Sequence, residues 1–181
     1  MADTLTHHAE NVWLAIEPSL PGFTVEVLPS IDSTSSELMR RARSGLMEPV
    51  LLAAEDQTAG RGRLGKGWHS KPGQSLTFSL AMPLSPANWS GLSLAVGVSL
   101  AHSLHVDVRL KWPNDLWLHQ RKIGGILVET ASTGEAGQGQ RMVVIGVGIN
   151  VARPEVSAVA ALVPDGAAAT AMAPAGLSEV L

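Results

Sequence analysis

The sequence of 181 residues contains no cysteine. Without thiols the protein can form neither a disulfide nor a thiolate zinc site, and it cannot use a cysteine nucleophile. This absence is typical of a reducing compartment. No stretch approaches the roughly 18 apolar residues of a membrane helix, and the N-terminus lacks the apolar core of a signal peptide. The sequence therefore predicts a soluble, cytoplasmic protein with no membrane partner.

Positive charge is scarce overall and concentrated in one place. Lys and Arg number 13 against 16 Asp and Glu, a formal net charge of −3, which argues against a general surface for polyanions. No carboxylate occurs from Gln57 to Val106. The same stretch carries four cations, at Arg61, Arg63, Lys66 and Lys71. This distribution indicates a local site for an anion.

The segment GRGRLGKG, residues 60–67, combines glycines with three of these cations. Amides of a glycine-rich loop can turn toward an anion and its cations can neutralise it, so a phosphate or carboxylate is the expected ligand. The spacing is not that of GxxxxGKS/T, because Gly67 follows Lys66. A dinucleotide-fold loop does not fit either, since a strand pattern follows. From the loop alone, a solvated connector and an RNA-binding segment both stay open.

Hydrophobic patterns predict several strands. They lie at residues 23–27, 49–55, 76–82, 109–112 and 141–151. A hairpin is expected to join 116–118 to 122–130 through His119 and Arg121. Residues 131–139 are predicted to form a loop, and the Ala-rich sequence after 151 has only weak organisation.

Two helices are predicted between these strands. Thr34 and Glu37 have the spacing of a capping box and Gly45 suits a helix end, so residues 35–44 are expected to be helical. Residues 89–104 place four side chains on one face, namely Leu92, Val96, Ser99 and Leu100. The chain therefore mixes strands and helices in one fold.

Five motifs occur in an order that resembles biotin protein ligases. They are DSTSSE (32–37), EDQTAGRGRLGKGW (55–68), LKWPND (110–115), RKIGGIL (121–127) and VIGVGIN (144–150). The resemblance implies an α+β fold, with a mixed β-sheet flanked by helices that is related to class II aminoacyl-tRNA synthetases. It also implies an N-terminal extension at 1–22 and a catalytic domain at 23–181. This domain is expected to be C-terminally incomplete, without the family's small C-terminal β-barrel.

Members of this family join biotin to ATP, giving biotinyl-5′-adenylate and pyrophosphate, and then pass the biotinyl group to a lysine. The resemblance therefore implies ATP and Mg²⁺ as cofactors. The implied partner is a biotin carboxyl carrier protein of acetyl-CoA carboxylase or a related carboxylase. Two alternatives stay open, a lipoate or octanoyl transferase of the same superfamily and a non-catalytic biotin-binding module. The oligomeric state also stays open, a homodimer included.

No DNA partner is expected. Some members of the family carry an N-terminal helix-turn-helix, which needs about three helices. The roughly 22 residues before the first predicted strand are too few for such a domain, and they contain no Lys or Arg.

The adenylation step sets the residue types that the site needs. A carboxylate and a phosphate 4 Å apart repel each other by about 4 kcal/mol at an effective dielectric of 20, so cations must line the site. By resemblance, Lys122, Arg63 and Asp115 are the catalytic residues. Lys122 lies between the biotin carboxylate and the α-phosphate, and Arg63 holds these anionic groups. Asp115 helps to place the metal or accepts a proton from the incoming lysine.

The resemblance also assigns the binding residues. Those implied for biotin are Ser33, Thr34, Gln57, Gly60, Arg61, Lys122, Gly125, Gly146 and Gly148. Those implied for ATP and the adenylate are Arg61, Arg63, Lys66, Trp68, Asn114 and Asn150. No role is assigned to Ser35, where the family usually has Asn, and the share of Lys66 is less defined because the family often has Arg. No protein metal site is expected, since no histidine has ligand spacing.

Some of these residues also have a purely structural explanation. Glycine weakens a strand unless another group must approach its backbone closely. For the glycines of these strands, that group is either the flat ring of biotin or a neighbouring strand. The packing explanation is strongest for Gly124. Trp68 is expected either to stack on adenine or to pack on the core. Trp112 is expected in the core.

Overall fold

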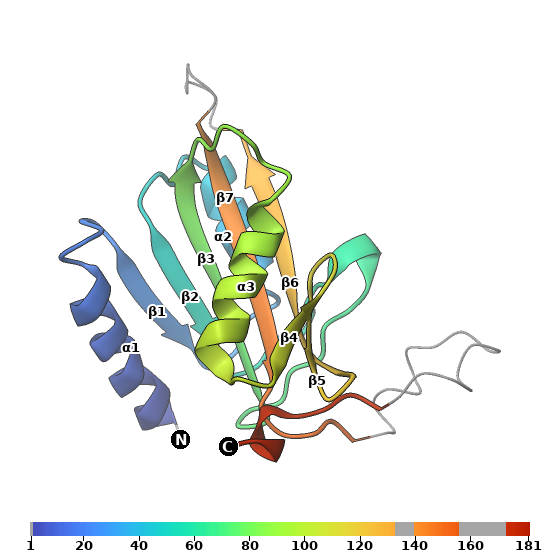
Figure 1. The fold of residues 1–181 in the computed structure, drawn as a ribbon. Helices are drawn as coiled ribbons and strands as arrows, with labels where there is room; N and C mark the ends of the chain where they lie inside the picture. Colours follow the sequence, from blue (N-terminus) through green and yellow to red (C-terminus); the bar gives the residue numbers. More distant parts are fainter. Residues whose placement is uncertain (1, 133–139, 156–172) are drawn as a thin grey trace.

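The structure is a computed structural model that describes residues 2–132, 140–155 and 173–181. Within these residues one mixed sheet has the order β1-β2-β3-β7-β6-β5-β4 (Figure 1). β1 and β2 are parallel, and the other neighbours are antiparallel. The strands span Thr24–Leu28 (β1), Val50–Ala54 (β2), Ser75–Leu84 (β3), Val108–Lys111 (β4), Asp115–Leu118 (β5), Arg121–Ala131 (β6) and Arg141–Asn150 (β7).

The predicted strands are confirmed, and so is the predicted hairpin. His119 and Gln120 have φ of 46° and 62°, the left-handed pair of a two-residue turn between β5 and β6. β6 extends to Ala131, so the first residue of the predicted loop belongs to a strand. Residues 133–139 of that loop lie outside the described residues.

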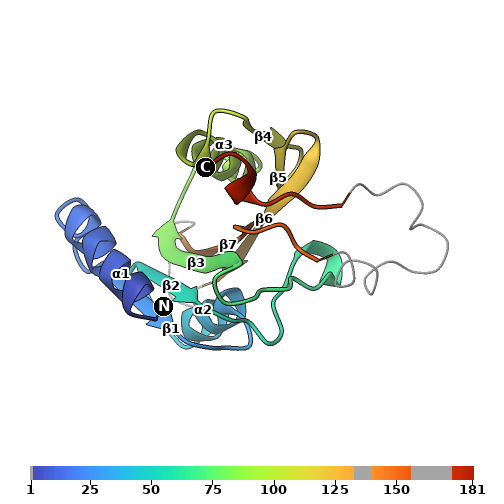
Figure 2. The same ribbon diagram turned by 90° about the horizontal axis from the view of Figure 1, so that it is seen from below.

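Alternation along the central strand β7 divides the core into two clusters. One cluster contains the alternate residues Val143, Ile145, Val147 and Ile149. The other contains Met142 and Val144. Successive side chains of a strand point to opposite faces, so the clusters lie on opposite faces of the sheet. Helix α3, Leu92–Leu104, covers the first cluster and helix α2, Thr34–Arg43, covers the second, as Figure 2 shows.

Helix α2 is the helix predicted at 35–44, but the prediction of Thr34 as its cap is wrong. The N-cap is Ser33, whose Oγ accepts a hydrogen bond from the Ser36 backbone N–H at 3.3 Å. Thr34 is the first helical residue, and its hydroxyl lies 2.8 Å from Ser79 Oγ on β3. Both residues can cap a helix, and this contact across the chain decides between them. Gly45 follows the helix with φ of 101°, as expected for a left-handed end.

Helix α3 begins at Leu92, three residues later than predicted, and the prediction for Ser99 is wrong. Its apolar stripe consists of Leu92, Val96, Leu100 and Leu104, which pack on the sheet. Ser99 falls outside this stripe and is exposed. Gly97 is buried instead, and a Cβ there would collide with Leu110 of β4. The missing side chain thus lets the helix approach the sheet closely.

Both terminal regions contact the sheet. Helix α1, Ala2–Ile16, lies beside β1, where Trp13 Nε1 donates to the Phe23 carbonyl at 3.0 Å. Near the other end, Ala175 and Leu177 are buried, although the sequence predicted weak organisation there. The Ala175 N–H donates to the Lys122 carbonyl at 2.9 Å, so this segment packs at the start of β6. Within the described residues, no helix is both long and apolar enough to cross a bilayer.

On the face of the sheet that α2 covers, strands β6 and β7 carry glycines beyond the apolar core. Gly146 and Gly148 continue the row of Met142 and Val144 on this face of β7, and Gly125 of β6 pairs with Gly148. A Cβ at Gly146 would collide with Ser35, and one at Gly148 with the ring of Trp68. At Gly125 the nearest atom to such a Cβ would be 3.6 Å away. The sheet therefore presents bare backbone here, partly covered and partly open.

Because the Trp68 ring covers Gly148, adding a single methyl group there should have a large effect on stability. We expect Gly148→Ala to lower the free energy of unfolding by about 1–3 kcal/mol, because the rigid Trp68 ring must move. Gly125→Ala is the matched control one strand away, and we expect a change within about 0.5 kcal/mol. Urea unfolding followed by circular dichroism measures both. Equal losses would show that the two positions are not differently crowded.

A network of ion pairs on α2 predicts a dependence of stability on pH. Glu37 accepts hydrogen bonds from Arg41 at 2.8 Å and from Arg40 at 2.7 Å, and these bonds lower the pKa of Glu37. The lowered pKa means that the carboxylate stabilises the fold above its unfolded pKa, and that this contribution is lost as the pH falls through the folded pKa. Glu37→Gln should therefore lower the free energy of unfolding by about 0.5–1 kcal/mol at pH 7.

The difference between Glu37→Gln and the wild type should be smaller at about pH 3 than at pH 7, because the contribution of the carboxylate is lost as the pH falls through its lowered folded pKa. Urea unfolding at the two pH values tests this. A difference that stays the same at the lower pH would mean that the charge of Glu37 does not stabilise the helix.

Candidate functional site

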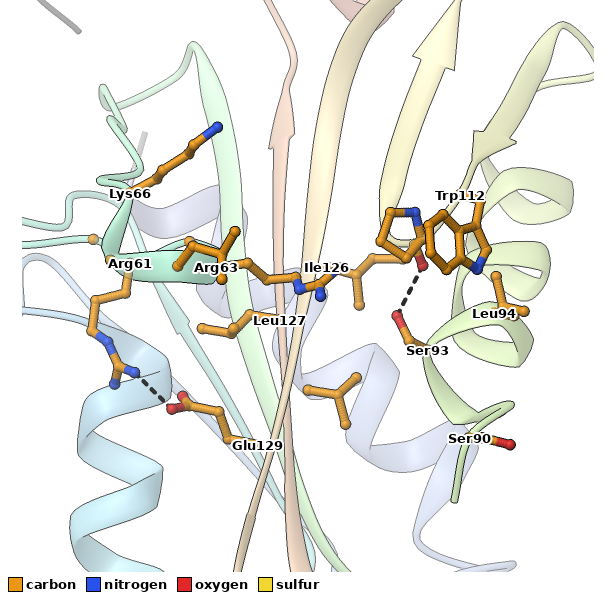
Figure 3. A pocket seen from close by; sticks show the side chains of 16 residues that line it. Arg61, Arg63, Lys66, Ser90, Ser93, Leu94, Trp112, Ile126, Leu127 and Glu129 are labelled. Carbon is orange, nitrogen blue, oxygen red and sulfur yellow. Dashed lines mark hydrogen bonds and ion pairs between the residues drawn. The ribbon is translucent and has the colours of Figure 1, made fainter. Parts of the chain in front are cut away.

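Two cavities meet at the glycine loop, which we define as residues 60–67. The smaller cavity, of about 440 Å³, lies over the glycine end of the sheet. The larger cavity, of about 710 Å³, lies between the loop and the start of α3 (Figure 3). Both are lined by Arg61, Arg63, Lys66, Ile126 and Leu127. The loop and β6 thus form the wall between the two cavities.

One end of the smaller cavity is polar and uncharged. Gln57 Oε1 accepts hydrogen bonds from the Thr34 backbone N–H at 2.8 Å and from Thr34 Oγ1 at 3.2 Å. Behind them, Ser79 Oγ lies 2.8 Å from Thr34 Oγ1 and 2.9 Å from Ser35 Oγ. Ser33, Thr34, Ser35 and Ser79 are all buried. Because these groups fix one another, they present hydroxyl and amide groups in defined positions.

The other end of the smaller cavity holds an ion pair. Lys122 Nζ donates to Asp115 Oδ1 at 2.7 Å. The register of β5 with β6 shifts here and leaves Ile123 without a partner, which turns Lys122 and Gly125 to the same face. A Cβ at Gly125 would lie 3.6 Å from Lys122 Nζ and 3.8 Å from Asp115 Oδ1. The glycine therefore leaves space beside the ammonium group.

The cations of the glycine loop have separate partners. Arg63 donates to Asn114 Oδ1 at 3.1 Å, and Asn114 Nδ2 donates to the Ile126 carbonyl at 2.8 Å. Arg61 instead pairs with Glu129 on β6, at 2.6 Å (Figure 3). The structure therefore links Arg63 to the motif that also contains Asp115, whereas Arg61 contacts the middle of β6.

The two tryptophans of the site differ from each other. The Trp68 ring lies against Gly148 and lines the smaller cavity, and its Nε1 is buried without a hydrogen-bond partner among the described residues. The prediction that Trp112 lies in the core is wrong, because 77% of it is exposed. It follows the last residue of β4 and lines both cavities.

All the predicted site residues except Gly60 and Asn150 line the smaller cavity. Gly60 lines the larger cavity, and a Cβ there would collide with the Trp68 carbonyl, so it serves close packing of the loop. Asn150 lines neither cavity, and its Nδ2 donates to the Ala175 carbonyl at 3.3 Å.

The sequence analysis left Ser35 without a role and did not identify Ser79 or Glu129. The last two are each indicated weakly by the sequence. Thr77 and Ser79 are polar residues at alternate positions of an otherwise apolar strand, which indicates one polar stripe. Glu129 is a carboxylate within the apolar sequence of β6, and such a residue needs a partner. Its partner could not be named from the sequence.

Comparison with known proteins agrees with this geometry. Residues 27–150 match the sequence model of the Biotin/lipoate A/B protein ligase family. The bifunctional ligase/repressor BirA of Escherichia coli is 46% identical over 144 residues, which cover 76% of this chain and 43% of that protein. The biotin–acetyl-CoA-carboxylase ligase of Mycobacterium tuberculosis is 36% identical over 138 residues, covering 70% of this chain and 49% of that protein. The chain thus spans about half the length of these relatives.

Solved structures show the same architecture. A biotin acetyl coenzyme A carboxylase synthetase from Helicobacter pylori with bound biotinylated ATP has a TM-score of 0.57 at 32% identity, covering 70% of this chain and 60% of that one. The biotin protein ligase from Aquifex aeolicus in complex with biotin and ATP has the same TM-score and identity, covering 73% and 54%. These likenesses confirm the predicted fold class, related to class II aminoacyl-tRNA synthetases. The chain belongs to the Biotin/lipoate A/B protein ligase family.

Proposed function

We propose that the chain is the catalytic part of an ATP-dependent biotin protein ligase. It joins biotin and ATP to give biotinyl-5′-adenylate and pyrophosphate, and it then transfers the biotinyl group to a lysine of a biotin carboxyl carrier protein. The main support is the ion pair of Lys122 with Asp115 beside Gly125, in a cavity whose other end is polar and uncharged. Such a cavity suits a ligand with a neutral polar ring at one end and a carboxylate at the other.

In the proposed first step, a carboxylate oxygen of biotin attacks the α-phosphorus of ATP and pyrophosphate leaves. The negative charge that gathers between the two groups needs fixed cations. Lys122 is held by Asp115 at 2.7 Å, and Arg63 is held by Asn114 at 3.1 Å. Because these partners orient both cations before any ligand binds, little rearrangement is needed when the charge develops.

The polar end is proposed to bind the ureido ring. Ser33, Thr34 and Gln57 offer hydroxyl and amide groups there. The open backbone at Gly125 lets a flat ring approach the sheet, and the Trp68 ring over the neighbouring Gly148 lines the same cavity. Ser35 already covers Gly146, and Trp68 already covers Gly148. These two glycines therefore contribute indirectly, by leaving room for the side chains of Ser35 and Trp68 in the cavity.

In the proposed second step, the amine of the carrier lysine attacks the acyl carbon of the adenylate and AMP leaves. Asp115 accepts the proton that the amine must lose. Arg61, Lys66, Trp68 and Asn114 are the proposed contacts of the nucleotide, since all four line the smaller cavity. Asn150 would have to release the Ala175 carbonyl before it could join them.

Magnesium is proposed to arrive with the triphosphate. Among the described residues there is no group of three His, Asp or Glu side chains that could hold a metal, and Asp115 is the one carboxylate that lines the smaller cavity. Mg²⁺ commonly binds through substrate phosphates with one or two carboxylates, and this site fits that arrangement with Asp115 as the protein ligand. The bound ion would offset part of the triphosphate charge.

We propose that residues 23–181 form the catalytic region and that residues 1–22 extend it, since β1 begins at Thr24. The carrier domain of a carboxylase is the protein partner, and no DNA partner is proposed. The absence of cysteine supports a cytoplasmic location.

The central prediction concerns Lys122. Lys122→Ala should lower the rate of biotin-dependent exchange of labelled pyrophosphate into ATP by at least about a hundredfold, because it removes a fixed cation from the transition state. Lys111→Ala is the matched control, since Lys111 stacks on Trp117 at 3.7 Å and lines neither cavity. Near-normal exchange in a folded Lys122→Ala protein would refute the assignment.

The choice of acid separates the proposed ligase from its relatives. The family that matches includes both biotin and lipoate ligases, so the same exchange should be measured with each acid. Exchange with biotin and none with lipoate is expected. Exchange with lipoate alone would identify a lipoate ligase, and binding of biotin without exchange would identify a binding module.

A further inference from the structure

Backbone contacts hold the two ends of the glycine loop together. The Trp68 N–H donates to the Gly60 carbonyl at 2.8 Å, and Arg61 forms an antiparallel bridge with Gly67. The four glycines between residues 60 and 67 give the loop many other conformations, so this closure alone restrains it weakly. Further restraint must come from its side chains.

The side chain of Arg61 links the start of the glycine loop to two other elements. Arg61 Nη2 lies 2.6 Å from Glu129 Oε1 on β6 (Figure 3), and Nη1 donates to Ser36 Oγ on α2 at 3.2 Å. A charge-assisted bond of this length is stronger than a bond between neutral groups. Since Arg61 lines both cavities, its ion pair with Glu129 fixes the glycine loop against β6 between them.

Stability alone does not explain a carboxylate at position 129. Glu129 Oε2 is buried and has no hydrogen-bond partner among the described residues. A buried carboxylate oxygen without a donor destabilises the fold, and a neutral side chain would avoid this cost. Glu129 thus keeps one buried oxygen without a donor while the other pairs with Arg61, which points to a role other than stability.

We propose that Glu129 is a positioning residue of the ligase, which fixes Arg61 and thereby the glycine loop over the bound ligands. It acts through the loop, because Arg63 and Lys66 follow Arg61 by two and five residues and line the same cavity. Releasing Arg61 would let the loop swing away and would displace these cations from the ligand. The inference rests on the function proposed above.

Limited trypsinolysis of the free chain tests the restraint without any ligand. In Glu129→Gln, cleavage after Arg61, Arg63 and Lys66 should rise several-fold, while the free energy of unfolding should be unchanged or higher. Glu26→Gln is the matched control, because Glu26 pairs with Arg41 at 2.7 Å on β1, away from the loop. Unchanged cleavage would overturn the proposal, and so would an increase explained by lower stability.

Two further measurements separate positioning from a merely structural role. For Glu129→Gln, the KM for biotin in pyrophosphate exchange should rise several-fold while kcat stays near the wild-type value. Cleavage after Arg63 and Lys66 should rise no more in the Arg61→Gln/Glu129→Gln double variant than in either single variant, because both changes break one pair. Additive effects, or a fall in kcat with unchanged KM, would refute the positioning role. If no exchange occurs in the wild type, the proposed function fails, yet the cleavage results still decide whether the pair restrains the loop.

Discussion

The pairing of β7 with its two neighbours fixes the direction of every side chain around the smaller cavity. Met142 and Val144 face α2, and the same alternation brings Gly146 and Gly148 to that face beyond them. A slip of one residue would turn these glycines to the other face and fill the cavity with the apolar side chains between them. The core and the binding surface are therefore set by one register.

A local irregularity then adds the charged end. In regular pairing, Lys122 and Gly125 would point to opposite faces of β6, because they lie three positions apart. The unpaired Ile123 removes this difference and places both beside Asp115. A bulge can redirect a side chain in this way without disturbing the rest of the strand, and Ile123 itself stays in the core.

Three cations of the site are held by different sets of partner groups. Lys122 has a carboxylate partner, Arg61 has a carboxylate and a hydroxyl, and Arg63 has an amide oxygen. These partners orient the cations, and a neutral partner such as Asn114 leaves the charge of Arg63 uncompensated. An anionic ligand would complete the charge balance, which explains why a protein with net charge −3 concentrates cations here.

The sequence by itself determined the strands, the turn at His119, the approximate span of α2 and the order of the motifs. These follow from local rules, because burial repeats every two residues in a strand and about every 3.6 in a helix. Only the tertiary structure decided that Ser33 rather than Thr34 caps α2, and that Trp112 is exposed. It also decided that Arg61 pairs with Glu129, 68 residues away. Such outcomes depend on which segments the sheet order brings together, and no local pattern of residues encodes that order.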